Sequence, residues 1–306
     1  MTVAGPGERP SFSIIVPTYG RPERLRECLA SLAAQDYPHG RIEVVVVNDG
    51  WEPRARLEES VTPFAGSAGA RLLHQEKAGP AAARNLGARA ARHPLLAFTD
   101  DDCRPDRGWL QALAPALAGS GNRVAGGATV NGLEEDRVAA ASQLLVTYLY
   151  GYYLREKRPF FASNNLGCSR ALFLRLGGFD TRFPLAGGED REFCDRCLGA
   201  GVEMVYVPQA RVEHRHALTV GGFLRQHYNY GRGAYAYHRI REERGGGRVG
   251  IEPPRFYRDL LLSPFTLGAR GQRLSSGLLL FFSQFANAAG FYREKLFPPR
   301  HPRKPG

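Results

Sequence analysis

The stretch Leu95–Cys103, LLAFTDDDC, places three consecutive carboxylates directly after a short apolar run. A run of this kind is typical of a buried strand in a parallel sheet, and ligands of open α/β sheets bind just beyond the carboxyl ends of such strands. Three adjacent carboxylates repel one another unless a counter-charge is near. A divalent cation that also holds substrate phosphates would supply that charge. The alternative is a solvated acidic turn that caps the following helix.

The chain before this stretch alternates apolar runs with helical patterns. Strands are predicted at residues 11–17, 42–47, 71–74 and 95–99, and helices at 23–35, 52–60 and 81–92. This order predicts an α/β fold with a mostly parallel central sheet flanked by helices. Thr18, Arg21 and Asp49 follow the first two strands, so we expect them to lie beside the acidic triplet. The sequence has neither G-x-G-x-x-G after the first strand nor a P-loop, which argues against dinucleotide enzymes and P-loop ATPases.

The formal net charge of +11 lies entirely in the last third of the chain. Residues 1–210 contain 24 Lys and Arg and 24 Asp and Glu, whereas residues 211–306 contain 17 and 6. This asymmetry indicates an anionic partner for the C-terminal part: lipid head groups, nucleic acid or an acidic substrate. Residues 1–10 are polar and rich in Gly and Pro, which predicts a flexible tail rather than a secretory signal. We therefore expect the five cysteines to be free thiols in a cytoplasmic protein.

Five short motifs occur in order along the chain. They are IIVPTY at Ile14–Tyr19, VVNDG at Val46–Gly50, GPAAARN at Gly79–Asn85, FTDDD at Phe98–Asp102 and GED at Gly188–Asp190. With these motifs the chain resembles a family 2 glycosyltransferase of the GT-A fold over about residues 11–216. The resemblance implies a catalytic domain at 11–240, with a Rossmann-like nucleotide-binding half at 11–103 and an acceptor half at 104–240. It also implies inverting, metal-dependent transfer of a sugar from a nucleotide-diphosphate sugar to an acceptor hydroxyl.

The resemblance assigns donor binding to Pro17, Tyr19, Arg21, Asp49, Arg84, Asn85, Asp100 and Asp101. Asp49 would accept hydrogen bonds from the base, since a carboxylate accepts from N–H donors. Arg84 and Asn85 would close on the base or ribose, and Asp100 would lie on the ribose. Asn48 and Trp51 stand where the family often has Asp and Ser. The base is therefore left open among UDP-, dTDP- and GDP-linked sugars.

The resemblance also implies a Mn²⁺ or Mg²⁺ ion on Asp102 of the D-x-D motif. The ion would bridge the diphosphate and neutralise the charge that develops as the sugar leaves. His214 and His216 lie two residues apart, so an extended segment would place both on one side. One of them could complete the metal shell, and the resemblance favours His214. The alternative is a histidine pair on the surface.

Glu189 and Asp190 precede a predicted helix at residues 191–198. The resemblance implies that Asp190 is the general base, which takes the proton from the acceptor hydroxyl as that oxygen attacks the anomeric carbon. A single displacement of this kind inverts the configuration, and Glu189 would orient the acceptor. The alternative is that both acids only stabilise the N-terminus of the helix.

Asn164 and Asn165 lie in the middle of a predicted strand at residues 160–168. Because Asn is unfavourable in strands, we expect these amides to face the donor sugar or the acceptor, and a simple turn or bulge is the alternative. The Tyr-rich segment 142–155 is predicted as a helix. Its aromatic side chains would either be buried as a helix flank or form a wall for the acceptor.

The segment 241–306 is predicted as a basic C-terminal extension with a linker at 245–247. Its apolar side chains recur at helical spacing at Leu278, Phe281, Phe282, Phe285, Ala289, Tyr292 and Leu296. Basic residues flank this stripe, and such an amphipathic helix can lie in the interface of an anionic membrane. The alternative is packing on the domain or on a second subunit in a homodimer. No uninterrupted apolar run reaches the roughly 18–20 residues that span a membrane.

Two other functions fit parts of the sequence. A nucleotidyltransferase on a similar sheet would also use metal and carboxylates, but we would expect a Gly-rich, basic first loop, and residues 18–22 contain one Gly and one Arg. A non-enzymatic nucleic-acid binder would use the basic tail and leave Asp102 and Asp190 dispensable. Such a binder has no use for clustered acids in a neutral half, so no nucleic acid partner is expected. We expect a transferase for a glycan or lipid-linked glycan, peripheral at the inner face of the plasma membrane, in cell-envelope polysaccharide biosynthesis.

Overall fold

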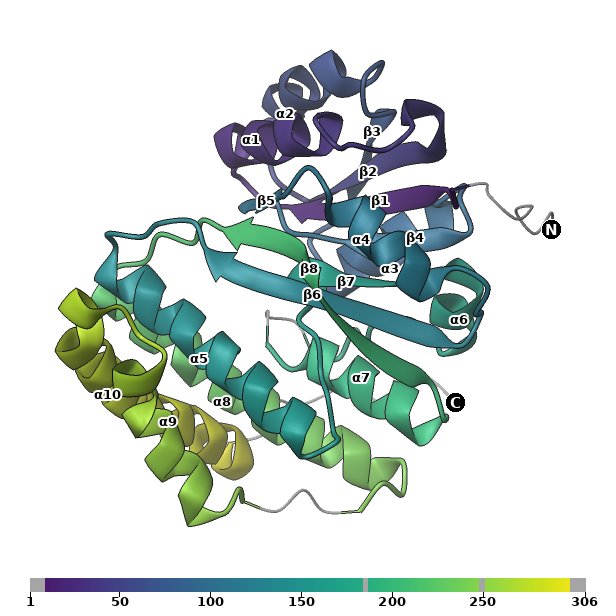
Figure 1. The fold of residues 1–306 in the computed structure, drawn as a ribbon. Helices are drawn as coiled ribbons and strands as arrows, with labels where there is room; N and C mark the ends of the chain where they lie inside the picture. The colour runs from purple at the N-terminus through teal and green to yellow at the C-terminus, as the bar shows by residue number, and fades with distance from the viewer. Residues whose placement is uncertain (1–8, 184–186, 248–250, 298–306) are drawn as a thin grey trace.

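The computed structural model describes residues 9–183, 187–247 and 251–297, and it is built around one eight-stranded sheet (Figure 1). The strand order is β3-β2-β1-β4-β7-β6-β8-β5. The strands are β1 Phe12–Thr18, β2 Ile42–Asp49, β3 Ala70–Gln75, β4 Leu95–Phe98, β5 Cys103–Pro105, β6 Arg123–Asn131, β7 Leu166–Ser169 and β8 Glu203–His214. The helices are α1 Pro22–Ala33, α2 Arg54–Val61, α3 Pro80–Ala90, α4 Trp109–Leu117, α5 Arg137–Arg155, α6 Arg170–Arg175, α7 Glu189–Gly199, α8 Val220–Glu243, α9 Pro254–Thr266 and α10 Arg273–Leu296.

The N-terminal half of the sheet is parallel, as the sequence predicts. β1 pairs with β2 and β4, and β2 pairs with β3, all in parallel register. Every residue of β1, β2 and β4 is buried, because helices cover both faces. Phe12 and Ile14 pack with residues of α1, α2 and α4, whereas Ile15 and Val47 pack with α3, α6 and α7. The carboxyl ends of these strands therefore meet at one edge of the sheet, where a ligand can reach them.

The C-terminal half of the sheet mixes both strand directions. β7 is antiparallel to β4 and β6, while β8 is parallel to β6 and antiparallel to β5. The β6–β8 register shifts between Gly127 and Ala128, next to the part of β8 that contains Pro208. Proline cannot donate to the ladder, so the irregularity lets one long strand continue through it. As a result, β8 carries His214 to a position paired with Cys103 of β5, directly after the acidic triplet.

The predicted strand at residues 160–168 is wrong in its first part. Ser163–Asn165 form a 3₁₀ turn, and β7 begins only at Leu166. The turn interpretation of the two asparagines is therefore confirmed. Its cause is Asn165, which is fully buried and bonded to other segments through its side chain.

Helices α5, α8, α9 and α10 form a layer beside the C-terminal half of the sheet (Figure 1). Tyr148 and Tyr152 of α5 pack with Phe256 and Leu260 of α9 and with Leu280 of α10 in one buried cluster. The tyrosines are therefore a buried flank, as one of the two interpretations predicts. The described part of the C-terminal extension packs on α5 and α8. Residues 1–8 of the predicted tail lie outside the described residues. All five cysteines are buried and free, as expected.

Candidate active site

The acidic triplet at the end of β4 already has a cationic partner from the first loop. Asp101 is fully buried and accepts a hydrogen bond from Thr18 Oγ1 at 2.7 Å. Arg21 lies 2.5 Å from Asp101 and 2.8 Å from Asp102 in two ion pairs. Burial raises the pKa of Asp101 to about 7, although the charge of Arg21 opposes this shift. Arg21 therefore supplies part of the counter-charge that the sequence assigned to a cation.

Asp102 lies between two imidazoles at the end of β8. His214 Nε2 is 3.4 Å from Oδ1 of Asp102, and His216 Nδ1 is 3.1 Å from Oδ2. The two rings are stacked with centroids 5.1 Å apart. Burial would raise the pKa of Asp102, but hydrogen bonds from both histidines and the charge of Arg21 hold it well below its ordinary value. Asp102 is thus an ionised carboxylate, and the structure brings it both candidate histidines rather than His214 alone.

This group fits a divalent cation. The ligand atoms of Asp102, Cys103 and His214 all lie within 4.8 Å of one another. Burial raises the pKa of the Cys103 thiol well above its ordinary value, so it stays protonated and is a poor ligand. One carboxylate and two imidazoles remain, a donor set that suits first-row divalent ions.

Arg84 joins the acidic triplet to the start of α7. Its side chain is almost completely buried and lies 2.6 Å from Asp100 and 3.1 Å from Glu189. Burial alone would lower the pKa of Arg84, but the charges of Asp100 and Glu189 raise it, so the guanidinium stays charged. The side chain predicted to lie beside the ribose thus also reaches the residue predicted to orient the acceptor.

Glu189 and Asp190 begin α7, and Gly188 precedes them with a φ of +103° that favours glycine. Glu189 accepts a hydrogen bond from the backbone N–H of Gly187 at 2.9 Å, and Asp190 accepts one from that of Arg191 at 2.8 Å. Burial and the adjacent charge of Asp190 raise the pKa of Glu189 to about 7, although Arg84 opposes this. Burial also raises the pKa of Asp190. A carboxylate whose pKa is raised toward neutrality is suited to accept a proton.

Tyr230 of α8 shows that the acids on the two sides of the site lie close together. Burial raises the pKa of this phenol, and the nearby charges of Asp190, Glu189, Asp100 and Asp102 raise it further. The acids that follow β4 and those that begin α7 therefore act on the same phenol. The sequence predicts that the Arg and aromatic residues of 225–233, which include Tyr230, clamp the diphosphate or the acceptor, with a solvated basic face as the alternative. That role stays a prediction.

Asp49 is held by the chain that follows it. Its Oδ1 accepts from Gln75 Nε2 and from the backbone N–H of Ala78, both at 2.8 Å, and its Oδ2 accepts from the N–H of Gly79 at 2.9 Å. These bonds fix the start of α3 against the end of β2. A carboxylate oxygen has about two lone pairs, so Oδ2 retains the capacity for one more bond. The contact of Asp49 with the base stays a prediction.

The two remaining residues of the first loop differ in exposure. Pro17 is buried within β1, whereas Tyr19 is exposed at the end of the strand. Lys77 lies over the Tyr19 ring, with its Nζ 4.2 Å from the ring centroid and 3.0 Å from the phenol oxygen. This cation–π pair adds a positive charge to the donor side that the sequence analysis missed.

The structure corrects two of the predicted ligand contacts. Asn85 donates to the carbonyl of Phe179 at 2.7 Å and accepts from the N–H of the same residue at 2.9 Å. It therefore fastens the loop after α6 and is not directed at the base or ribose. Asn165 accepts from Trp109 Nε1 at 2.8 Å and donates to two backbone carbonyls. Because Asn165 is fully buried, it positions the 3₁₀ turn and is not available to an acceptor.

Asn164 bonds to β6 through its side chain, since its Oδ1 accepts from Thr129 Oγ1 at 3.3 Å. The acceptor role of Asn164 stays a prediction.

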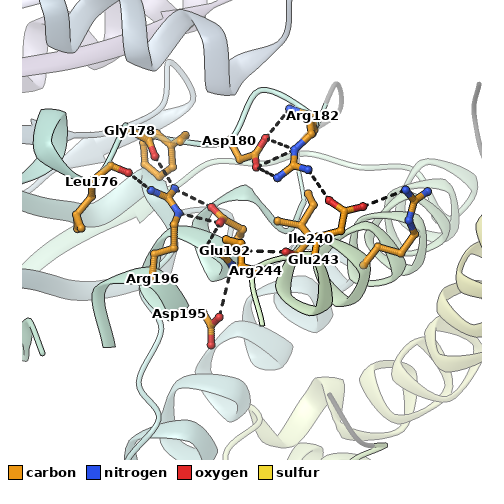
Figure 2. Close-up of polar contacts among 12 residues, drawn as sticks. Leu176, Gly178, Asp180, Arg182, Glu192, Asp195, Arg196, Ile240, Glu243 and Arg244 are labelled. Atoms are coloured by element: carbon orange, nitrogen blue, oxygen red, sulfur yellow. Dashed lines mark hydrogen bonds and ion pairs between the residues drawn. The ribbon is translucent and has the colours of Figure 1, made fainter. Parts of the chain in front are cut away.

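The loop before Asp190 is fastened to α7 and α8 (Figure 2). Arg196 of α7 pairs with Glu192 at 2.7 Å and donates to the backbone carbonyls of Leu176 and Gly178. Glu192 also pairs with Arg244, which follows α8, at 2.9 Å. These bonds connect three segments and fix the helix that carries the predicted base.

A cavity of about 400 Å³ lies next to this network. Its walls come from the loop around Arg182, from α8 through Asn229 and Tyr235, and from Glu294 of α10. Arg182 is itself held by Asp180 at 2.7 Å and by Glu243 at 2.8 Å (Figure 2). The cavity reaches Gly187, three residues before Asp190 in the sequence.

We expect replacement of Arg84 by Met to lower the free energy of unfolding by about 3–5 kcal/mol, because it leaves the buried Glu189 without its charge partner. Urea denaturation followed by circular dichroism measures the change. The matched control is Arg92→Met, since Arg92 is mostly exposed and makes only a 3.9 Å pair with Glu43. Its change should stay within about 0.5 kcal/mol. Equal changes in the two variants would show that Arg84 does not hold the site together.

Known proteins of one enzyme family resemble this chain in sequence. The chain fits the family model for glycosyl transferase family 2 over residues 13–177 and that for glycosyl transferase family group 2 over residues 98–292. It is 26% identical over 224 residues to the glycosyltransferase AglE of Haloferax volcanii, with 73% of each chain covered. It is 28% identical over 223 residues to the glucosyl-dolichyl phosphate glucuronosyltransferase of the same organism, covering 66% of this chain and 68% of the relative.

A third relative is longer. The pre-mycofactocin glycosyltransferase of Mycobacterium tuberculosis is 28% identical over 238 residues, which cover 74% of this chain and 47% of the relative. The chain thus spans about half the length of that protein.

Solved structures share the fold. The mannosyltransferase PcManGT from Pyrobaculum calidifontis, in complex with GDP-Man and Mn²⁺, superposes with a TM-score of 0.63 at 19% identity, covering 94% of this chain and 89% of that one. GalNAc-T7 with UDP, GalNAc and Mn²⁺ gives a TM-score of 0.56 at 18% identity, covering 83% and 55%. The predicted GT-A fold is confirmed.

Proposed function

This chain belongs to glycosyl transferase family 2, and we propose that it transfers a sugar with inversion from a nucleoside-diphosphate donor to an acceptor hydroxyl. It is a glycosyltransferase that acts with a nucleotide sugar. One observation carries the finer proposal: Arg84 holds Asp100 and Glu189 on a single guanidinium. This shared ion pair supports a site in which Asp100 serves the donor and Glu189 the acceptor.

We propose that the donor lies across the ends of β1, β2 and β4. Tyr19, Arg21 and Asp49 border this edge, and Lys77 adds a positive charge that favours a diphosphate. The structural relatives solved with GDP-Man and with UDP support a donor of this class. A binding panel of UDP-, dTDP- and GDP-linked sugars would distinguish among these donors.

Asp102, His214 and His216 would hold a divalent cation, and we propose Mn²⁺ or Mg²⁺. The donor set fits, and two structural relatives contain Mn²⁺. When bound, the ion would neutralise charge on the leaving diphosphate. This chain's own contribution is to keep Asp102 ionised, through the two histidines and Arg21.

We propose that Asp190 accepts the proton of the acceptor hydroxyl. The new bond forms between that oxygen and the anomeric carbon while the bond to the diphosphate breaks, so one displacement inverts the centre. Glu189 would orient the acceptor from its position between Arg84 and Gly187. The raised pKa of Asp190 and the proximity of both acids to Tyr230 support this division of roles.

We propose a glycan or lipid-linked glycan as the acceptor, at the cytoplasmic face of the plasma membrane, in cell-envelope polysaccharide synthesis. One relative carries dolichyl phosphate in its name, which supports a lipid-linked acceptor. The cavity that reaches Gly187, three residues before Asp190, supports an acceptor on this side of the protein.

A panel of nucleoside-diphosphate sugars tests the proposed function. We expect one donor to bind by calorimetry when Mn²⁺ is present and to be slowly hydrolysed without acceptor. Binding of a nucleoside triphosphate with release of diphosphate, and no binding of any nucleotide sugar, would support the nucleotidyltransferase alternative. Binding of nucleic acid alone would support the non-enzymatic alternative.

The acidic limb of the pH–rate profile should move when Glu189 is replaced by Gln. The charge of Arg84 lowers the pKa of Asp190, and Glu189 is an acidic partner of the same guanidinium. Removal of the Glu189 carboxyl should leave more of that positive charge to Asp190 and lower its pKa. Since Asp190 must be ionised to act, activity should persist to a pH about one unit lower. The measurement is kcat/KM against pH. Glu203→Gln is the control, because Glu203 is exposed and pairs only with Arg123 at 2.6 Å. A shift toward higher pH would contradict the proposed coupling.

A further inference from the structure

We propose that the outward face of α10, with the adjoining part of α9, inserts apolar side chains into an anionic lipid bilayer. On α10 this face presents Leu278, Phe282, Phe285 and Tyr292, each more than half exposed, and α9 adds the half-exposed Leu262 and Phe265. We call these six residues the apolar face. The surface lies outside the catalytic site, so its test does not depend on the proposed sugar transfer.

The residues of α10 occur at the spacing of one helix stripe. Phe281 is also exposed, and its ring contacts Phe282 and Phe285 at centroid distances of 5.5 and 5.0 Å. Soluble monomers rarely expose contiguous apolar patches of this kind without a partner. The stripe predicted from the sequence is therefore present, but it points away from the rest of the protein.

The inner face of α10 explains this orientation. The residues turned toward α8 and the core include Ser276, Ser283 and Gly290. A Cβ added at Gly290 would lie 1.9 Å from the backbone oxygen of Tyr228, and one added at Gly231 would lie 1.8 Å from that of Asn287. The two helices thus approach backbone to backbone.

This packing differs from that of a typical helix in a soluble protein, because small residues are buried and large apolar residues are exposed. An amphipathic helix in water buries its large apolar residues and exposes polar ones. Helices in lipid pack through small residues and leave large apolar side chains on the outside. Leu280 is the one large apolar residue of α10 that is buried, against α5 and α9, and the contact of α8 with α10 otherwise follows the second pattern. This packing supports lipid as the medium that the apolar face contacts.

The length and composition of the segment agree with this inference. Among the described residues, Arg270–Leu296 is the one helical segment long and apolar enough to cross a membrane. Only 22% of its most apolar window is buried, so it is not a core helix. Because α10 packs along α8 and also contacts α5, its free side can lie in the plane of the bilayer surface.

Basic residues at both ends of α10 favour a membrane with anionic lipids. Arg270 and Arg273 precede the apolar face, and Arg293 and Lys295 follow it. The acid at this end of α10, Glu294, is buried and pairs with Arg232 of α8 at 2.7 Å and with Arg293 at 2.9 Å, so two cations share one carboxylate and the end of the helix stays positive. Basic groups at both ends of an apolar stripe favour anionic head groups. An anionic bilayer matches both the apolar and the basic parts of the surface.

Sedimentation of the full chain with vesicles tests the proposal. We expect binding to vesicles of phosphatidylcholine mixed with phosphatidylglycerol, and weaker binding to phosphatidylcholine alone or at high salt. The double variant Phe282→Gln/Phe285→Gln should bind at least about tenfold more weakly, because it removes two aromatic side chains from the lipid. The matched control is Leu174→Gln/Val220→Gln, which changes two exposed apolar residues on α6 and α8 and should bind as the parent does.

A second measurement keeps the proposal testable if the double variant is poorly folded. Tryptophan at position 282, in the variant Phe282→Trp, should shift its emission to the blue when the mixed vesicles are added, whereas Val220→Trp should not. Equal sedimentation of the double variant and the parent would overturn the proposal. It would also be overturned by light scattering that shows a dimer without vesicles and a monomer for the double variant, since a second copy would then cover the apolar face.

Discussion

Asp190→Asn should lower kcat by roughly 10²–10⁴-fold while leaving donor affinity nearly unchanged. An amide of the same shape cannot take the proton of the acceptor hydroxyl, but it can still accept the N–H of Arg191 that holds this position at the start of α7. The lost charge at the helix N-terminus should change stability by only about 0.3–1 kcal/mol. The effect should therefore lie in the chemical step rather than in folding or donor binding.

Steady-state rates at saturating donor, together with calorimetric titration of the donor, separate these quantities. Asp195→Asn is the matched control, because Asp195 lies on the same helix and pairs with Arg241 at 2.8 Å, away from the carboxylate cluster. We expect that variant to keep its turnover. If Asp190→Asn retained the parent rate, another group would have to be the base.

Asp102→Ala should abolish the Mn²⁺ dependence of nucleotide binding. Loss of an outer-shell partner commonly weakens metal affinity by about 10–100-fold, and a direct ligand should matter at least as much. Asp102 is the carboxylate that both His214 and His216 approach, so its removal leaves two imidazoles without their anionic partner.

The electron paramagnetic resonance signal of free Mn²⁺ measures this binding without any turnover, and calorimetry with nucleoside diphosphate gives the coupled affinity. Asp106→Ala serves as the control, since the side chain of Asp106 is partly exposed and pairs with Arg211 at 3.4 Å. An unchanged Mn²⁺ titration for Asp102→Ala would refute the metal site.

The parallel half of the fold could be predicted because its strands are continuous apolar runs with little choice of partner. Val44 to Val47 can only be a buried strand, and the polar residues after it mark its end. The 3₁₀ turn at Asn165 could not be predicted, because its cause lies in distant segments that bond its amide. The orientation of α10 was also beyond the sequence pattern, since periodicity defines a stripe but not the side on which it packs.

The candidate site shows the same division. Motif spacing predicted a site built from the acids at the ends of β2 and β4 and at the start of α7. Arg84 joins the acids after β4 to those of α7, and the place of Asp49 in the site stays a prediction. The role of Asn85 was wrong, because the motif gave its neighbourhood but not its bonds to Phe179. Contacts such as that of Arg84 with Glu189 join residues 105 positions apart and depend on the whole fold.

The guanidinium shared by Asp100 and Glu189 would also couple donor binding, as proposed at Asp100, to the protonation state of Glu189. A donor that engages Asp100 would loosen that carboxylate from Arg84 and leave more of the positive charge to Glu189. Glu189 would then release its proton more readily, because a nearby cation favours its ionised form. By reciprocity, deprotonation of Glu189 would strengthen donor binding, so donor affinity should rise with pH near neutrality. Glu189 would therefore become fully ionised only after the donor has bound.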